Sequence, residues 1–435
     1  MLVGFAAVSV VTSVVSGLTG AFVMPAETAP IAPVAAVAGV TSDAAPGSSG
    51  AGSRTAGSAA SASTSTLGRL ASLSASALPA YLSGHRAEID KLISDPPAAS
   101  DVSRVWSLLD SAQQTVLLKE TPHLVGNLEG VPYSVRGRAN ALDLARTISS
   151  AKAHLTTERG KTERLVLQRQ LTTLGNVETA LKKKDGVTRT LVSLDTSDDA
   201  KAAIVVGDLS TADYVSVLVP GMYMSVGEQI EGWAQVAQDL HDQQTGFLKR
   251  LLGPRSGTTT PGVAVVAWIG YQTPVLTNIG GMALAQEGAD SLERTLEGIQ
   301  SLRASDPPYL SVFAHSYGST AALLALERGT VQVDALALMG SPGSDAQSEK
   351  DLSVRDGNVF VGEAPMDPIV DSAFFGSDPG SPSYGAKKMD VSGAVDPITH
   401  RTLAGSSGHN EYFTAGTECM RNLAMIGIDQ GRLVL

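Results

Sequence analysis

Short apolar runs alternate with longer helical patterns along the second half of the chain. The run Val263-Ala-Val-Val-Ala-Trp268 is apolar at every position, which is typical of a strand buried on both faces of a mostly parallel sheet. Comparable runs predict about eight strands, at residues 188–194, 202–206, 215–219, 263–269, 310–314, 333–339, 358–361 and 387–391. Helical patterns lie between these runs, at about 226–252, 281–303 and 317–328. The alternation predicts a three-layer α/β domain over residues 186–435, with helices on both faces of the sheet.

A purely helical pattern precedes this domain, over residues 69–185. Asp110-Ser-Ala-Gln113 has the sequence of a capping box at a helix N-terminus. Apolar residues at spacings of four and three mark one face of a later helix, namely Leu167, Leu171, Leu174, Val177 and Leu181. We therefore expect an N-terminal helical region, which is either a lid over the functional site or a separate domain.

The first 68 residues are poor in charge. Residues 1–26 carry no charged side chain and are long enough for an export signal or one membrane span. Ala36-Val-Ala38 has the small residues of a signal cleavage site. The segment therefore predicts a protein that is secreted or anchored at the cell envelope. Because no Lys or Arg precedes the apolar stretch, a cytoplasmic protein with a terminal tail is the alternative. Residues 27–68 are rich in Ala, Pro, Ser, Gly and Thr, and predict a disordered linker.

Ser316 has the surroundings of a catalytic nucleophile. An apolar strand pattern ends just before it, and an Ala-rich helical pattern follows it, as in a nucleophile elbow. The sharp turn of such an elbow requires small residues two positions away on either side, and these are Ala314 and Gly318. The same spacing of small residues surrounds Ser406, but no strand precedes it and no helix follows, so it is interpreted as part of a loop.

A serine nucleophile requires a base and an acid that orients the base, and in this fold they follow in the order serine, acid, histidine. Asp367 lies a few residues after the predicted strand 358–361 and is our candidate acid, with Asp371 and Glu363 as alternatives. Two histidines follow the last predicted strand, His400 and His409, and position alone favours His409 only slightly.

The oxyanion of an acyl-transfer intermediate needs two backbone N–H donors. We assign one to Tyr317, directly after the nucleophile, and the other to Met222, in the loop after the third predicted strand. Gly221 allows the backbone of this loop to approach the substrate. Tyr271, just after another strand end, is expected to line the substrate pocket.

Charge and cysteine content exclude several other classes of function. The net charge of −11 argues against binding nucleic acid or anionic lipid by bulk attraction. The single cysteine, Cys419, cannot form an internal disulfide, and no Cys/His cluster has zinc-ligand spacing. We therefore expect no metal and no other cofactor, and a small-molecule or lipid ester as the partner. The N-terminal apolar segment is the expected point of any membrane association.

Distinctive blocks lie both inside and outside the predicted sheet domain. They are Gly126-Asn127-Leu-Glu-Gly130-Val-Pro132 with Arg136, Val219-Pro-Gly221-Met, Trp268-Ile-Gly-Tyr271, His315-Ser-Tyr-Gly-Ser-Thr320, Gly340-Ser-Pro-Gly343, Asp367-Pro-Ile369 and His409-Asn-Glu-Tyr-Phe413. On these blocks, roughly residues 100 to 430 resemble abhydrolase family 8, a bacterial family of α/β hydrolases. The resemblance implies an α/β-hydrolase fold and carries the family's triad onto Ser316, Asp367 and His409. Ala314 departs from the family, which usually has Gly there.

These features together predict a serine hydrolase that cleaves a carboxylic ester or a lipid ester. The alternative is a non-catalytic protein of the same fold that binds a ligand or partner at the cell surface. The absence of Gly at position 314 and the long linker favour this second hypothesis.

Overall fold

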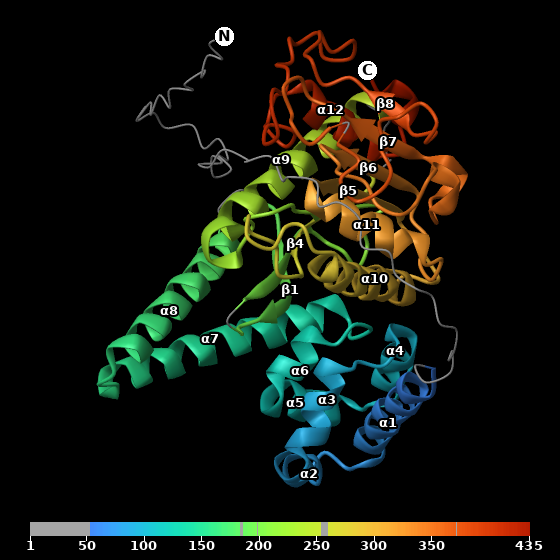
Figure 1. Cartoon of the computed structure of the whole chain (residues 1–435). Coiled ribbons are helices and arrows are strands. Elements are labelled where there is room, and N and C mark those ends of the chain that lie inside the picture. Colours follow the sequence, from blue (N-terminus) through green and yellow to red (C-terminus); the bar gives the residue numbers. More distant parts are fainter. Residues whose placement is uncertain (1–52, 183–185, 198, 254–259, 371) are drawn as a thin grey trace, which may run out of the picture.

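The computed structural model describes residues 53–182, 186–197, 199–253, 260–370 and 372–435. An eight-stranded sheet consists of β1 (Arg189–Asp195), β2 (Lys201–Gly207), β3 (Tyr214–Val219), β4 (Val263–Ile269), β5 (Tyr309–His315), β6 (Ala335–Met339), β7 (Val359–Gly362) and β8 (Lys387–Met389). Four helices belong to the same domain, α9 (Val226–Leu252), α10 (Ala283–Leu302), α11 (Tyr317–Glu327) and α12 (Glu418–Ile426). Each predicted strand and helix of this domain is present (Figure 1).

The strand order in the sheet is β1-β2-β4-β3-β5-β6-β7-β8. The strands from β4 to β8 along this order run parallel, while β2 runs antiparallel to both β1 and β4. Parallel neighbours place their carboxyl ends at one edge, so the loops after β3, β5, β6 and β7 meet there. The sheet is therefore mostly parallel, as predicted, and it gathers the candidate site residues at one edge.

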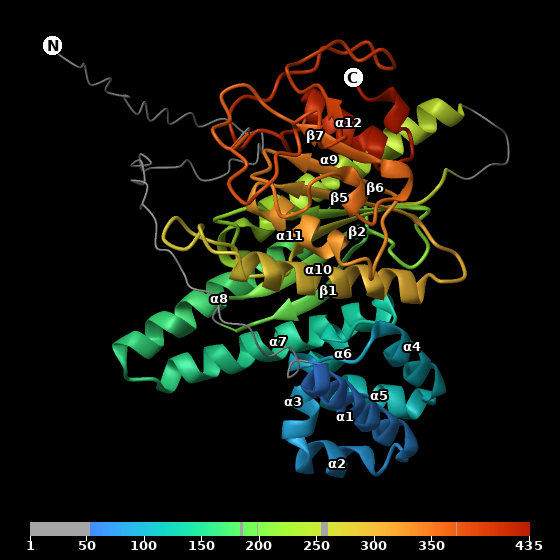
Figure 2. The same ribbon diagram turned by 45° about the vertical axis from the view of Figure 1, so that its right-hand side comes forward.

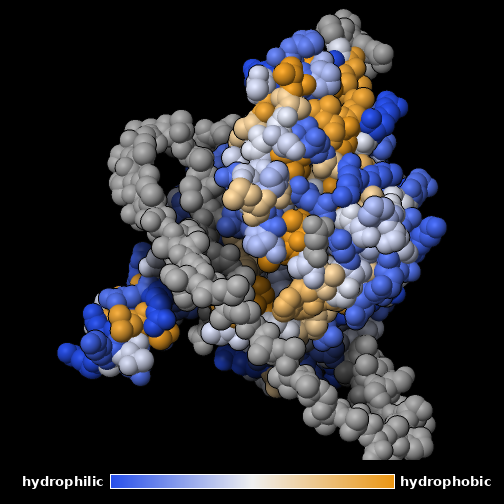
Figure 3. Space-filling model, turned by 45° about the horizontal axis from the view of Figure 1, so that its top comes forward, coloured by the Kyte–Doolittle hydropathy of each residue, from blue (hydrophilic) through white to orange (hydrophobic). Residues whose placement is uncertain are grey.

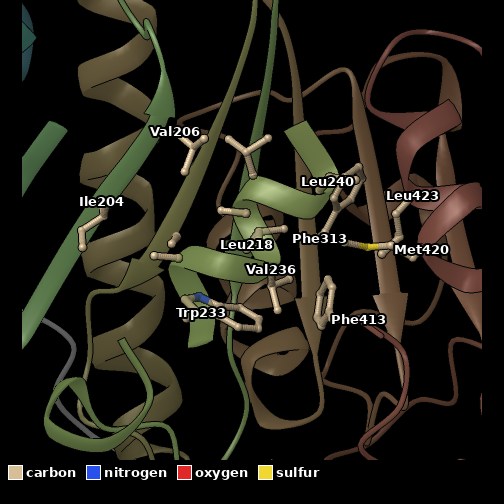
Figure 4. Packing of buried hydrophobic residues seen from close by; sticks show 14 of the residues in the cluster. Ile204, Val206, Leu218, Trp233, Val236, Leu240, Phe313, Phe413, Met420 and Leu423 are labelled. Atoms are coloured by element: carbon tan, nitrogen blue, oxygen red, sulfur yellow. The ribbon is translucent and has the colours of Figure 1, made fainter. Parts of the chain in front are cut away.

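Helices cover both faces of the sheet because its strands are apolar on both sides. All seven residues of β4 are buried, and so are all five of β6. One face packs against α9, where Trp233 meets Phe413 edge-on at a ring distance of 5.2 Å and Leu240 lies near Phe313 (Figure 4). The other face packs against α10 and α11, through residues such as Leu292. The predicted three-layer architecture is confirmed.

The N-terminal helical region contains α1 (Ser53–Ser72), α2 (Leu78–Gly84), α3 (Arg86–Ser94), α4 (Ala99–Leu108), α5 (Ser111–Glu120), α6 (Pro122–Asn127), α7 (Tyr133–Thr157) and α8 (Lys161–Leu181). Helices α1–α6 form a bundle on the opposite side of the molecule from α12, and α7 and α8 extend from it as a long pair (Figures 1 and 2). The predicted capping box is present, since Asp110 accepts a hydrogen bond from the Gln113 N–H and Gln113 accepts one from the Asp110 N–H.

The linker predicted over residues 27–68 ends earlier in the structure. Residues 53–68 lie in α1, because its alanines favour a helix and because Leu67 and Leu70, three residues apart, pack into the core of the helical bundle. Residues 1–52, including the apolar segment 1–26, lie outside the described residues, so export or anchoring stays a prediction. Across the described residues, every helix is too short or too polar to serve as a membrane span.

The block around Asn127 joins the helical bundle to the sheet. The Asn127 side chain donates to the Leu194 carbonyl and accepts from the Leu194 N–H, at 2.9 and 2.8 Å, so its amide pairs with the free edge of β1 as another strand would. Asn140 of α7 donates to the carbonyls of Leu191 and Gly126. A side chain at Gly126 would lie 1.9 Å from Asn140 Oδ1. The most distinctive block of the family resemblance therefore has a structural role, which sequence reasoning did not assign.

Candidate active site

Ser316 lies in the turn between β5 and α11, and its backbone is strained. Its φ is 54° and its ψ is −132°, a conformation that a residue with a side chain rarely adopts. The Ser316 N–H donates to the carbonyl of Met339 in β6 at 2.9 Å, which holds the turn against the sheet. This strand, turn and helix form the predicted nucleophile elbow.

The loop after β3 packs tightly against this elbow. The Tyr271 hydroxyl donates to the Pro220 carbonyl at 2.7 Å, and a side chain at Gly318 would lie 2.3 Å from the same oxygen. A side chain at Gly221 would lie 2.6 Å from Ser316 Cβ. Glycine is therefore required at both positions, because a side chain at Gly318 would collide with the Pro220 carbonyl and one at Gly221 would collide with Ser316.

The structure brings Ser316, His409 and Asp367 together in one hydrogen-bonded chain. His409 Nε2 lies 2.7 Å from Ser316 Oγ, and His409 Nδ1 lies 2.9 and 3.0 Å from the two carboxylate oxygens of Asp367. The Asp367 side chain is fully buried, while the His409 side chain is 11% exposed. The three side chains have the order of contacts that nucleophile, base and orienting acid require.

Tyr412 and the local backbone keep Asp367 ionised. Burial alone would raise the pKa of Asp367, but hydrogen bonds from His409, Tyr412 and the Ile369 N–H outweigh it, and the pKa lies below its ordinary value. The Tyr412 hydroxyl donates to Asp367 Oδ2 at 2.6 Å and accepts from the Ala364 N–H at 2.9 Å. Burial, followed by the contact with Asp367, raises the pKa of Tyr412, so it stays a donor. Sequence reasoning did not assign Tyr412 a role.

His315, the residue before Ser316, packs against His409 and bonds to its backbone. Its Nε2 lies 2.7 Å from the backbone carbonyl of His409, and the two imidazole rings are 4.7 Å apart. Burial, and then the nearby His409, lower the pKa of His315 to about 3 from its ordinary 6.5. A neutral ring that donates Nε2–H to the carbonyl fits both facts.

We expect His315 to make the protein less stable as the pH falls below about 6.5. Its folded pKa lies below its unfolded value, so between pH 6.5 and 3 the unfolded chain binds the extra proton and unfolding becomes easier. The slope is at most about 1.4 kcal/mol per pH unit. Denaturant unfolding at pH 7.5, 6 and 5 checks this. We expect the free energy of unfolding of His315→Gln to fall less steeply with falling pH than that of the wild type. Equal slopes would contradict the prediction.

Gly340, at the end of β6, leaves the space that the His409–Asp367 pair occupies. Its φ is 53°, and a side chain there would lie 2.6 Å from Asp367 Oδ2 and 3.0 Å from His409 Nδ1. Sequence reasoning noted Gly340 only as part of a distinctive block. Its need for glycine comes from a contact with two loops that are distant in the sequence.

The two proposed oxyanion donors flank Ser316. Tyr317 is the first residue of α11, a position at which the backbone N–H has no partner within the helix, and Met222 follows Gly221 in the loop that touches Ser316. Among the hydrogen bonds of the described residues, neither N–H is used as a donor. The Tyr317 hydroxyl is held by the Gly281 carbonyl and the Ala285 N–H.

The alternative site residues that the structure describes make no hydrogen bond to Ser316. Glu363 forms an ion pair with Lys388 at 2.9 Å, and His400 is exposed in a loop. Ser406 donates to the Glu411 carbonyl at 3.3 Å, as part of a loop. Asp371 lies outside the described residues. No His, Cys, Asp and Glu cluster within the described part of the chain could hold a metal ion.

A cavity of about 550 Å³ opens beside the loop after β3. Its walls include Tyr223 and Met224 from this loop, Tyr271 and Val275 from the segment after β4, and Arg169 from α8. Tyr271 thus lines a cavity, although its hydroxyl is also bonded to the adjacent loop. Because α8 forms one wall, the N-terminal helical region contributes to the surface beside the site.

Most of the sheet domain matches a known protein family. Residues 195–377 match the family model Abhydrolase_8, described as alpha/beta hydrolase. These residues belong to the α/β-hydrolase family. The matched part of the chain contains Ser316 and Asp367 and ends before His409.

The relatives of this chain add little about its chemistry. The uncharacterized protein Rv2079 of Mycobacterium tuberculosis is 26% identical over 393 residues, which cover 77% of the chain and 57% of the relative. The chain thus spans just over half the length of that relative. The uncharacterized protein Rv0963c of the same species is 28% identical over 218 residues, covering 49% of the chain and 78% of the relative.

Among the solved structures that resemble the chain weakly are two esterases. Carboxyl esterase 2 from Tuber melanosporum has a TM-score of 0.34 and 11% identity, covering 58% of the chain and 90% of the esterase. The ferulic acid esterase AmCE1/Fae1A from Anaeromyces mucronatus has a TM-score of 0.35 and 11% identity, covering 58% of the chain and 96% of the esterase. Similarity at this level says nothing about the substrate of the chain.

Proposed function

We propose that this α/β hydrolase is a serine hydrolase that cleaves carboxylic esters. The observation that carries the proposal is the unbroken chain of short contacts from Ser316 Oγ through His409 to the buried carboxylate of Asp367. A serine hydroxyl is a weak nucleophile at neutral pH, and this arrangement is the one that activates it. Amide cleavage and acyl transfer would use the same groups, and substrate tests separate them.

In the proposed reaction, Ser316 Oγ attacks the ester carbonyl while its proton passes to His409 Nε2. Asp367 stabilises the imidazolium that forms and holds its Nδ1–H. The N–H groups of Tyr317 and Met222 bind the oxyanion. His409 then gives the proton to the departing alcohol, leaving an acyl ester on Ser316. Water, deprotonated by His409, attacks this ester and regenerates the serine.

A fluorophosphonate probe tests the proposal directly. We expect the wild type to become labelled on Ser316, and Ser316→Ala to lose the label. The matched control is Ser406→Ala, because Ser406 has small neighbours at the same spacing but, among the described hydrogen bonds, donates only to the carbonyls of Glu411 and Val391. This control keeps full labelling. A folded wild type that stays unlabelled would overturn the proposal and favour the non-catalytic binding protein.

A further inference from the structure

Large apolar side chains are exposed on two loops that border Ser316. Met366 is 88% exposed and Phe374 61% exposed on the loop after β7. Val275 is 41% exposed and Leu276 39% exposed on the loop after β4. We call these four residues the apolar rim. Figure 3 shows apolar areas, in orange, among hydrophilic ones on the face that comes forward when the top of Figure 1 is tilted towards the viewer.

Phe374 is connected to the nucleophile through two other rings. Its ring lies 4.8 Å from that of Phe375, which lies 5.6 Å from the ring of Tyr317, the residue after Ser316. The Phe375 N–H also donates to the Pro342 carbonyl at 3.1 Å. A row of three packed aromatic rings therefore leads from Tyr317, which is buried beside Ser316, to the exposed Phe374.

Met366 is held beside the acid and the base. It lies in a turn that is closed by the Asp367 N–H and the Ala364 carbonyl, and its φ is 63°. The neighbouring Pro365 carbonyl accepts the Gly408 N–H at 2.8 Å, which joins this turn to the loop that carries His409. A strained backbone that holds an exposed methionine at a functional site points to a role in that site.

The other side of the rim is fixed to the oxyanion loop. Tyr223 has a φ of 60°, its N–H donates to the Pro274 carbonyl at 3.0 Å, and its hydroxyl accepts the Leu276 N–H at 3.2 Å. Val275 and Leu276 are therefore positioned by the same loop that supplies Met222. The rim thus lies on both sides of the proposed acylation site.

The loop that carries Val275 and Leu276 contains no charge. From Gly270 to Gln286 there is no Asp, Glu, Lys or Arg, although 17% of the whole chain is charged. Exposed apolar surface next to a site is typical of a surface that binds an apolar ligand. The net charge of −11 disfavours an anionic ligand.

We infer that the apolar rim binds the acyl chain of the substrate, which is an ester of an uncharged acyl chain of medium or greater length. The inference rests on the proposed function. Withdrawing a methylene group from water contributes about fourfold in affinity when it is fully buried. An acyl chain that lies along the rim therefore raises the rate of acylation of Ser316 for longer esters.

The test compares p-nitrophenyl acetate with p-nitrophenyl octanoate, in the full chain. We expect kcat/KM to be at least about tenfold higher for the octanoate, since six further methylene groups contact the rim in part. In Phe374→Ser and Met366→Ser, the octanoate-to-acetate ratio falls severalfold. Leu108→Ser is the matched control, because Leu108 is 68% exposed on α4 in the helical bundle, and its ratio equals that of the wild type.

The outcomes separate this inference from the proposed function. Acetate turnover with equal or lower octanoate turnover overturns the rim as an acyl site and leaves the serine hydrolase standing. No turnover together with no fluorophosphonate labelling overturns both. The ratio of the labelling rates with dodecyl and ethyl fluorophosphonates reports the same preference for chain length without turnover. The rate is also measured against tributyrin concentration. If it rises once tributyrin exceeds its solubility limit, the substrate is aggregated lipid. If it saturates below that limit, the substrate is a dissolved ester.

Discussion

Replacing Asp367 by asparagine is expected to lower kcat by about four orders of magnitude, with little change in KM. The asparagine amide would present an N–H to His409 Nδ1, which favours the tautomer in which Nε2 carries the proton and cannot accept one from Ser316. The Tyr412 hydroxyl would then donate to a neutral amide instead of a carboxylate. Steady-state kinetics on p-nitrophenyl esters measures the loss.

The control for this variant is Glu363→Gln. Glu363 was an alternative acid on sequence grounds, but it pairs with Lys388 and has no contact with His409 among the described hydrogen bonds. We expect Glu363→Gln to retain activity within a few-fold. If Asp367→Asn retained a tenth or more of the wild-type kcat, another group would orient the base and the proposed triad would be wrong.

Gly340→Ala is expected to lower kcat by about a hundredfold. The added methyl group would fall within 2.6 Å of Asp367 Oδ2 and 3.0 Å of His409 Nδ1, so the pair must shift. A displacement of about 1 Å in a catalytic group costs about two orders of magnitude in rate. The positive φ adds a stability cost of about 1–3 kcal/mol. Enzyme kinetics and denaturant unfolding measure the two effects separately.

Gly329→Ala separates the loss of geometry from the loss of stability. Gly329 also has a positive φ, of 74°, but the nearest atom to an added methyl group is Ser353 Oγ at 3.9 Å, outside the site. We expect this variant to lose comparable stability and to keep its kcat. Equal losses of kcat in the two variants would show that backbone strain, and not contact with the His409–Asp367 pair, causes the effect.

The sheet domain could be predicted because each of its strands is a continuous apolar run. Both ends of every predicted strand lie within two residues of an observed strand. The largest differences, of two residues, are at the start of β6 and at the end of β8; residue 333 was predicted as strand but makes only an isolated bridge to Val354. The elbow was equally local, since Ala314, Ser316 and Gly318 lie within five positions.

The remaining contacts of the site could not be predicted, because they join distant parts of the sequence. Tyr412 contacts Asp367 across 45 positions, and His315 contacts the His409 carbonyl across 94. No spacing rule connects such pairs. Gly340 shows the same limit, because its requirement for glycine depends on where two later loops return to the sheet. The disordered linker was placed too far along the chain, since composition alone missed the packing of Leu67 and Leu70.

The pairing of Asn127 with β1 makes the sheet domain depend on the helical region. β1 pairs only with β2 in the sheet, and its outer N–H and carbonyl groups are met by side chains from α6 and α7. Removing the helical region would leave an open strand edge, which invites pairing with other copies and aggregation. The sheet domain is therefore expected to aggregate when it is produced without the helical region.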